Sequence, residues 1–307
     1  MIATNTTIEP GIYHHVEFDK YKSWAAMNMS TLLWGRTSMQ HMKAAIDGLL
    51  NKESDALNFG RALHHYILER DTFDIHWQLA QSCDAVLKSG DSKGETCGKS
   101  GTKTDGEFWR CGTHAKGLPG FKDPENCITR NEMDDILSMA NALKGHPVVK
   151  LLRQRGGCEA SAMFEVRGVP CKCRLDKLIA NEKFPTIIDL KTVRSGWGER
   201  DKFQKHIYDY DYAIRAAFYV DAVKQLKGYE PSFIWVVVED SAPFAVGVYQ
   251  CDPHTLAWGR FMYETLIGSY KNALSTGVWS GYTTKIEELG LPQWVFKRFE
   301  GALETVQ

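Results

Sequence analysis

The chain has 307 residues, of which 43% are hydrophobic and 24% charged, a composition typical of a folded globular protein. The formal net charge of -1 excludes a strongly basic DNA-binding arm, so any DNA-binding surface must come from local arrangement of basic residues. Residues 1–10 lack the charged start and apolar run of an export signal, and no apolar run reaches membrane-spanning length. We therefore expect a cytoplasmic protein with no membrane contact, whose eight cysteines are reduced thiols, some of them candidate metal ligands.

The first half of the chain is predicted to contain two helices followed by an insertion. After an irregular lead-in, Ser30 is expected to be the N-cap of a helix whose apolar residues recur through Leu50, and a second helix is expected over residues 56–69. Eight of the 26 glycines then fall within residues 90–120, where apolar periodicity disappears. We therefore divide the chain into an N-terminal helical part (1–82), a Cys-rich insertion (83–127) and a core with C-terminal helices (128–307).

The second half alternates strands and helices. A helix over residues 131–152, limited or kinked by Pro147, should precede three strands over 159–166, 169–179 and 186–193 that form an antiparallel meander. The remaining predicted elements are a helix over 212–226, strands over 233–239 and 244–250, and a helix from about Pro253. This order predicts an α/β fold with a mixed central β-sheet flanked by helices.

Two carboxylates and one ammonium group are expected to meet on neighbouring strands of the meander. Asp189 and Lys191 share one face of their strand because strand side chains alternate, and Asp176 on the adjacent strand can reach the same point. Carboxylates and water are the ligands that Mg²⁺ prefers, and a nearby ammonium can stabilise charge on a phosphate. The pattern is therefore suited to phosphodiester hydrolysis.

A cross-strand salt bridge on a solvated face is the structural alternative for this short Asp-x-Lys pattern. The alternative is weakened by the run Ile187-Ile188-Asp189-Leu190, which places an acid inside an apolar strand where an unpaired charge is costly. Asp176 is placed in a similar way, between Leu175 and Leu178 with one lysine intervening.

The motifs, taken in order, resemble a known family. They are Gly60-Arg61-Ala62-Leu63-His64, Glu159, Asp176, Asp189-Leu190-Lys191 and Arg215-Ala216-Ala217-Phe218-Tyr219. This order resembles the RecB-like branch of the PD-(D/E)xK nucleases, and within it the exodeoxyribonuclease VIII (RecE-type) phage recombination exonucleases. The resemblance covers about residues 20–275 apart from the insertion.

The resemblance implies a role for each matching residue. His64 would be a metal ligand on a helix. The adjacent His65 is the residue most easily mistaken for that ligand. Without the resemblance, a helical histidine near a core is more often structural than a metal ligand. Asp176 and Asp189 would be the acidic ligands. The carbonyl of Leu190 would be a further ligand and Lys191 the catalytic lysine. Glu159 matches a family acid that would support these metal ligands without binding the metal itself.

Two positions depart from the family pattern. Leu175 stands where the name-giving proline is expected, and Arg215 replaces the glutamine of a helix that keeps Tyr219. An arginine could hold a DNA phosphate in a bidentate contact but cannot reproduce the glutamine acceptor.

Basic residues near the motif were also considered as DNA contacts. Lys172 and Arg174 share strand parity with Asp176 and are expected to line the same cleft. A basic loop after the catalytic strand either grips phosphates and stacks on a terminal base or is a solvated surface loop. Its candidate residues are Arg194, Trp197, Arg200, Lys202 and Lys205.

The insertion contains a second ligand pattern. Cys83, Cys97, Cys111 and His114 are the residue types that hold tetrahedral Zn²⁺, and the surrounding glycines would let a short chain fold around the ion. Cys127 is a replacement ligand in this hypothesis. The alternatives are a flexible loop with reduced thiols, or an iron–sulfur cluster, which the clustering of these cysteines before Asp176 disfavours.

The resemblance implies a Mg²⁺- or Mn²⁺-dependent exonuclease that degrades duplex DNA ends, with 5′ to 3′ polarity, in recombination or repair in a bacterial host or its phage. It would act on double-stranded DNA ends, with a single-strand annealing recombinase or further copies of itself as partners. A structure- or site-specific endonuclease on the same core is the alternative, and a DNA-binding protein without catalysis is the second. The intact Asp176, Asp189 and Lys191 argue against loss of catalysis.

Overall fold

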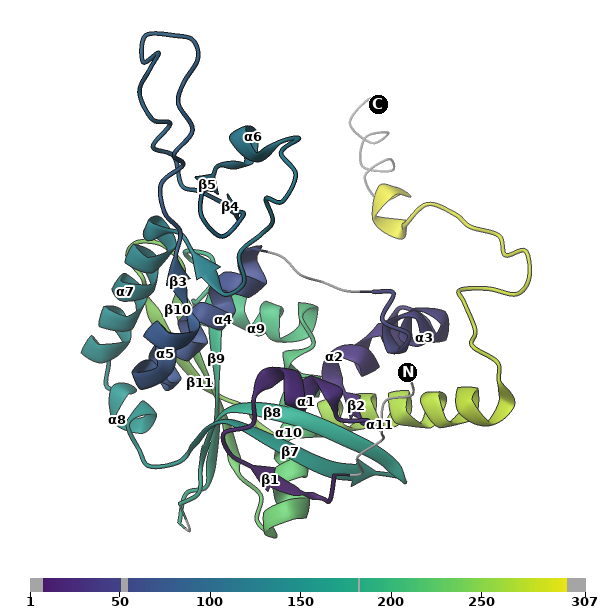
Figure 1. Cartoon of the computed structure of the whole chain (residues 1–307). Helices are drawn as coiled ribbons and strands as arrows, with labels where there is room; N and C mark the ends of the chain where they lie inside the picture. Colours follow the sequence, from purple (N-terminus) through teal and green to yellow (C-terminus); the bar gives the residue numbers. More distant parts are fainter. Residues whose placement is uncertain (1–7, 51–54, 182, 297–307) are drawn as a thin grey trace, which may run out of the picture.

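The structure is a computed structural model that describes residues 8–50, 55–181 and 183–296. The start of the expected lead-in and position 182 of the loop before the third meander strand lie outside these residues. A seven-stranded mixed sheet runs through the centre of the molecule in the order β1-β7-β8-β9-β10-β11, with β2 beside β8 (Figure 1). Helices cover both faces of this sheet, which confirms the predicted fold class.

The meander has the predicted topology. Strands β7 (Gly157–Val166), β8 (Val169–Ile179) and β9 (Thr186–Val193) pair antiparallel in sequence order. β9 then pairs in parallel with β10 (Ser232–Glu239), which forms an antiparallel pair with β11 (Val246–Gln250). The sheet is mixed because the long helical connection between β9 and β10 returns the chain in the same direction.

The pairing of β8 with β9 is short, and its end positions the candidate site. The register joins Lys177 to Ile188 and Ile179 to Thr186, and it stops there. Asp176 and Asp189 are the next residues along the two strands, so they lie where the strands separate. A carboxylate can therefore reach backbone groups that a continued ladder would occupy.

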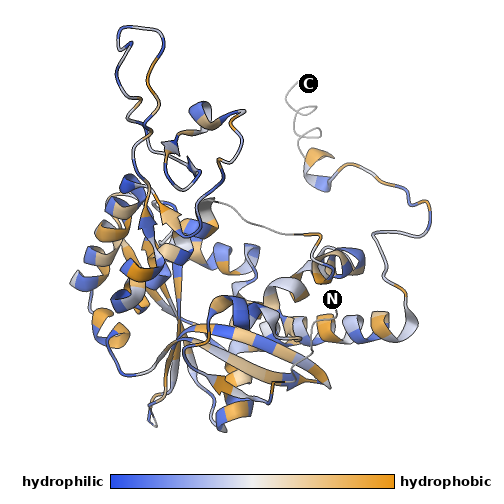
Figure 2. Ribbon diagram, viewed as in Figure 1, coloured by the Kyte–Doolittle hydropathy of each residue, from blue (hydrophilic) through white to orange (hydrophobic). Residues whose placement is uncertain are grey.

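Two apolar layers enclose the sheet. One packs helices α10 (Tyr212–Lys227) and α11 (Pro253–Thr276) against it through residues such as Phe218 and Ile267. The other packs α4 (Asp55–Leu68), α5 (Arg70–His76) and α7 (Arg130–Gly145) on the opposite face. Figure 2 shows hydrophobic residues along the strands and on the helices beside them.

The N-terminal region is more ordered and more divided than predicted. The expected lead-in contains β1 (Gly11–Tyr13), α1 (Phe18–Ser23) and β2 (Met27–Asn28). The expected single helix is three short segments, α2 (Met29–Leu32), the 3₁₀ helix η1 (Leu33–Arg36) and α3 (Met39–Ile46).

The N-cap assigned to Ser30 was wrong. The side chain of Asn28 accepts the Thr31 N–H and starts α2, and Ser38 caps α3 by accepting the N–H of His41. Two local capping side chains therefore compete with the continuous apolar pattern and restart the helix.

Two other boundaries differ from the prediction in informative ways. The helix predicted over 131–152 ends at Gly145 and resumes as α8 (Val149–Leu152), on either side of Pro147. The basic segment interpreted as one loop is a loop over 194–199 followed by α9 (Arg200–Asp209), which the side chain of Glu199 caps by accepting backbone N–H groups.

Residues between the first helices and α7 form the insertion, which stands away from the sheet in Figure 1. Its base is a parallel pair of β3 (Gln78–Leu79) and β6 (Cys127–Ile128). Within it lie β4 (Lys103–Thr104), β5 (Trp109–Arg110) and α6 (Gly112–Ala115). Among the described residues, no helix of the chain has the length and apolar character needed to cross a membrane.

Candidate functional site

Asp176 lies at the point where β8 and β9 separate. Its Oδ2 accepts the backbone N–H of Leu190 at 2.7 Å, which replaces a bond of the interrupted ladder. The carboxylate is thereby fixed in orientation while its side chain remains 15% exposed. Its remaining lone pairs are available to a further partner.

His64 approaches Asp176 from helix α4. Ala62 and Leu63 are fully buried against the second core layer, which fixes the rotation of the helix. The Nδ1 atom of His64 lies 3.4 Å from Asp176 Oδ2. His65 instead bonds the Thr72 hydroxyl at 2.9 Å and accepts the indole N–H of Trp77, so it faces away from the strands.

Glu159 completes a compact group with these two residues. The register of β7 with β8 joins Cys158 to Lys177 and Ala160 to Leu175, so Glu159 lies opposite Asp176. Glu159 has a φ of 47°, a left-handed conformation that is strained for a residue other than glycine. Ligand atoms of His64, Glu159 and Asp176 all lie within 4.8 Å of one another. We call these three residues the acidic cluster.

The acidic cluster differs from the ligand set inferred from the sequence. Glu159 was expected to support the ligands, but its carboxylate is part of the compact group. Asp189 was expected to be a ligand, but in this structure it forms an ion pair with Lys191 beside the cluster. Lys191 Nζ also lies 3.5 Å from the carbonyl oxygen of Leu190, the expected backbone ligand.

The ionisable groups of the site shift one another's pKa values. Burial raises the pKa of Asp189 in spite of the Lys191 ammonium, and repulsion from Asp176 raises it further. Burial also favours the neutral form of Asp176, but the positive charges of His64 and Lys191 outweigh it and lower the Asp176 pKa. Burial opposes the charge of Lys191, but the two aspartates raise its pKa, so the ammonium persists at neutral pH.

The negative charge on Glu159 is also disfavoured by its surroundings. Burial raises its pKa and repulsion from Asp176 adds to that effect, against the neighbouring guanidinium of Arg174. Arg174 Nε donates to Glu159 Oε2 at 2.6 Å, and its Nη1 donates to the Val16 carbonyl. A cation among these carboxylates would relieve their mutual repulsion.

The other residues singled out from the sequence take different places. Arg174 is committed to Glu159, and Tyr219 is partly buried near both aspartates, which with Arg215 contribute to its electrostatic surroundings. Arg215 is partly exposed and its Nη1 lies 3.4 Å from the Ser30 hydroxyl.

The prediction that Lys172 lines the cleft was wrong. Its side chain is 3% exposed, and its ammonium donates to the carbonyls of Tyr21, Lys22 and Trp24. Lys172 therefore holds the N-terminal segment on β8 and is not available to a DNA phosphate.

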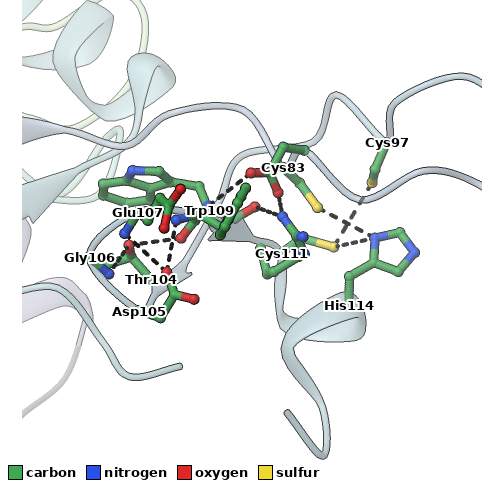
Figure 3. Close-up of polar contacts among 12 residues, drawn as sticks. Cys83, Cys97, Thr104, Asp105, Gly106, Glu107, Trp109, Cys111 and His114 are labelled. Carbon is green, nitrogen blue, oxygen red and sulfur yellow. Dashed lines mark hydrogen bonds and ion pairs between the residues drawn. The ribbon is translucent and has the colours of Figure 1, made fainter. Parts of the chain in front are cut away.

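The four expected zinc ligands lie together in the insertion. His114 Nδ1 is 3.4 Å from Cys83 Sγ and 3.5 Å from Cys111 Sγ, and Cys97 Sγ is 4.0 Å from Cys111 Sγ. Figure 3 shows these side chains pointing toward one another from separate stretches of the insertion. We call them the cysteine cluster. Cys127, considered as a replacement ligand, bonds instead to the carbonyl of Ile128.

The turn at the start of α6 brings two of these ligands together. Cys111 is the N-cap residue, and its carbonyl accepts the backbone N–H of His114. Cys83 and Cys97 come from opposite ends of a hairpin-like loop, where the Cys97 N–H donates to Ala85 and the Gly98 N–H donates to Cys83. The cluster therefore ties both ends of that loop to α6.

The sequence did not reveal a buried carboxylate that fixes the loop after β9. Glu239, at the end of β10, is 4% exposed and accepts the Gly196 N–H at 2.7 Å, with the Ser195 hydroxyl at 3.4 Å. Tyr249 donates to the Gly198 carbonyl at 2.6 Å. The signal that could have found this contact is the acid ending an otherwise apolar strand, Val236-Val237-Val238-Glu239.

A family model matches most of the chain. Residues 20–291 match the model of a family described as a PDDEXK-like domain of unknown function (DUF3799). The chain belongs to this family. The match confirms the resemblance to PD-(D/E)xK proteins, while the closer resemblance to RecE-type exonucleases stays a prediction. No curated protein matches the chain in sequence.

Solved structures give the fold alone. A protein from Eubacterium rectale, described as a "putative exonuclease", superposes with a TM-score of 0.56 at 10% sequence identity, covering 92% of this chain and 98% of that one. A second structure, that of SSO0001, is 20% identical but has a TM-score of 0.25 over 44% of this chain and 60% of that one, which carries no argument.

Proposed function

We propose that the chain is a Mg²⁺- or Mn²⁺-dependent nuclease that hydrolyses phosphodiester bonds of DNA. One observation carries the proposal: the acidic cluster of His64, Glu159 and Asp176 lies beside the Asp189–Lys191 ion pair where two buried strands separate. Membership of a PDDEXK-like family supports the same function. The eight cysteines, none of which lies in a disulfide, favour action in the reducing cytoplasm.

The donor set of the acidic cluster fits a hard divalent cation, because two carboxylates and a histidine nitrogen converge on one point. We propose that His64, Asp176 and Glu159 hold the cation, with Asp189 and the Leu190 carbonyl as further ligands once Lys191 turns toward substrate. Such a cation lowers the pKa of bound water and neutralises phosphate charge.

The residues of the chain have separate tasks in this proposal. Lys191 keeps its proton, since the surrounding carboxylates raise its pKa, and its ammonium would stabilise the negative charge that develops on phosphate oxygens. Arg174 would hold Glu159 in position through their bond. Arg215, partly exposed near the site, would contact a DNA phosphate.

We further propose that the substrate is a duplex DNA end, degraded 5′ to 3′ in phage-type recombination or repair. The resemblance of the motifs and the fold shared with the Eubacterium rectale protein support an exonuclease. The test uses end-labelled linear duplex, nicked circle and covalently closed circle, each with Mg²⁺. An exonuclease degrades the linear duplex and spares the closed circle, whereas cleavage of the closed circle would establish the endonuclease alternative.

We also propose that the cysteine cluster binds one structural Zn²⁺. Zinc–sulfur bonds of about 2.3 Å in a tetrahedral site place ligand atoms about 3.5–3.8 Å apart. The separations of 3.4, 3.5 and 4.0 Å in the cluster are close to that geometry. Metal analysis of protein purified under reducing conditions without chelator should find about one zinc per chain.

A further inference from the structure

A continuous series of aromatic rings leads from Lys191 to the surface beside α9. Lys191 Nζ lies 5.1 Å from the centre of the Tyr212 ring. The Tyr212 ring stacks on Tyr210 with centroids 5.8 Å apart, and Tyr210 meets His206 edge-on at 4.9 Å. His206 stacks on Trp197 at 4.5 Å. We call Trp197, His206, Tyr210 and Tyr212 the aromatic track.

Neighbouring side chains fix the backbone that carries the aromatic track, and its rings are partly or largely exposed to solvent. Glu239 and Tyr249 fix the backbone of the loop that carries Trp197. The ring of Tyr210 is 57% exposed, and Trp197 and His206 are partly exposed. Burial lowers the pKa of His206, so its ring is neutral near pH 7 and can act as an aromatic surface. A ring as exposed as Tyr210 adds little to the hydrophobic core.

The loop and α9 carry four exposed cationic side chains beside the track and three exposed acidic ones, Glu199, Asp201 and Asp209. Arg194, Arg200, Lys202 and Lys205 are all exposed on the loop and on α9. Exposed rings flanked by cationic side chains suit single-stranded nucleic acid, because the rings stack on base faces while the cations attract phosphates. Away from its ends, duplex DNA presents only base edges in its grooves, so internal base pairs cannot stack on such rings.

We propose that the aromatic track binds unpaired bases of the strand whose phosphate is cleaved beside Lys191. The inference rests on the proposed nuclease function and specifies its substrate as a strand separated from its complement near the site. Base stacking on the track would hold that strand in line with the acidic cluster, independently of base sequence.

The test compares a fluorescent oligothymidylate with an abasic strand of the same length, in Ca²⁺ without chelator, by fluorescence anisotropy. The wild type should bind the base-containing strand more tightly. Tyr210→Ala should lose this preference, on the order of 10-fold, because stacking on one aromatic ring is lost. Tyr210→Phe should keep it, because the ring remains.

Tyr208→Ala is the matched control. Tyr208 lies on α9 two residues before Tyr210 and is 61% exposed, but its ring meets Trp258 and not the track. An equal loss in Tyr208→Ala, an unchanged preference in Tyr210→Ala, or equal binding of both strands by the wild type would overturn the track. Failure of the wild type to bind either strand would also overturn the track, whereas failure to cleave linear duplex in Mg²⁺ would contradict the proposed nuclease function.

Discussion

The acidic cluster and the cysteine cluster both bring ligands together, but different parts of the structure hold them. The acidic cluster lies on two strands and a helix that pack in buried apolar layers. The cysteine cluster lies on loops and on the four-residue helix α6, with Trp109 as a buried apolar neighbour. In the first case the fold holds the ligands in position, whereas in the second the bound ion would hold the fold.

The difference also appears in the electrostatics. Burial, together with repulsion from Asp176, raises the pKa of Glu159 in the acidic cluster, and Lys191 and Arg174 supply the compensating charge within the protein. The site can therefore form before a cation arrives, and it releases stored repulsion when one binds.

Removal of metal should separate the two clusters most clearly. Chelation with EDTA is expected to abolish DNA cleavage while the helical circular dichroism of the sheet-and-helix core changes little. Mg²⁺ or Mn²⁺ should restore cleavage, and Ca²⁺ should bind yet support little turnover. Chelation should also make residues 83–127 susceptible to protease, and Zn²⁺, but not Mg²⁺, should restore their protection. Cleavage that persists in excess EDTA would contradict the mechanism.

Lys191→Ala should leave the fold intact and remove the positioned charge. We expect the initial cleavage rate on linear duplex to fall on the order of 10²–10³-fold, as for loss of one such electrostatic contact. Mn²⁺ affinity by calorimetry should be unchanged or tighter, because a charge that repels the cation is gone. Asp189→Ala, in contrast, should lower both affinity and rate. Near-normal cleavage by Lys191→Ala would show that the lysine is only the ion-pair partner of Asp189.

Cys111→Ser should act on the insertion alone. Zinc content is expected to fall from about one ion per chain to a small fraction of that, with lower solubility and faster proteolysis within residues 83–127. Cys127→Ser is the control, because its thiol bonds to the Ile128 carbonyl outside the cluster. Equal zinc loss in both variants, measured by atomic emission on reduced protein, would refute the assignment of these ligands.

The sequence predicted the parts of the fold that local patterns specify. The strands over 169–179 and 186–193 have the predicted bounds, because the first alternates apolar and polar residues, the second is mainly apolar, and turn residues close both. β1 and β2 were missed, since strands of two or three residues take their stability from partners far along the chain. The same limit hid α9, whose segment reads as basic and has one fully buried apolar residue, Phe203.

The candidate site shows the same division. Alternation along the strands placed Asp189 with Lys191, and the motif order placed His64 near Asp176. The position of Glu159 depends on a left-handed residue opposite Asp176, and the burial of Lys172 depends on carbonyls about 150 positions away. Contacts between side chains and partners distant in the sequence therefore could not be predicted from local sequence patterns.

Thr129→Ala should have the smallest effect and should test where the insertion ends and the core resumes. Thr129 starts α7 with a capping box, in which its hydroxyl accepts the Glu132 N–H and the Glu132 carboxylate accepts the Thr129 N–H at 2.7 Å. Loss of such a cap costs about 1 kcal/mol of unfolding free energy, and the melting temperature should fall by roughly 2–4 °C. Thr129→Ser keeps the hydroxyl and should retain most of the stability. Zinc content and cleavage should stay at wild-type levels in both variants, because α7 packs on the sheet through Ile136 and Met139 whether or not the insertion is ordered. A simultaneous loss of zinc in Thr129→Ala would show that the insertion and the core fold as one unit. The distinction between an acidic cluster held by the fold and a cysteine cluster held by its ion would then be wrong.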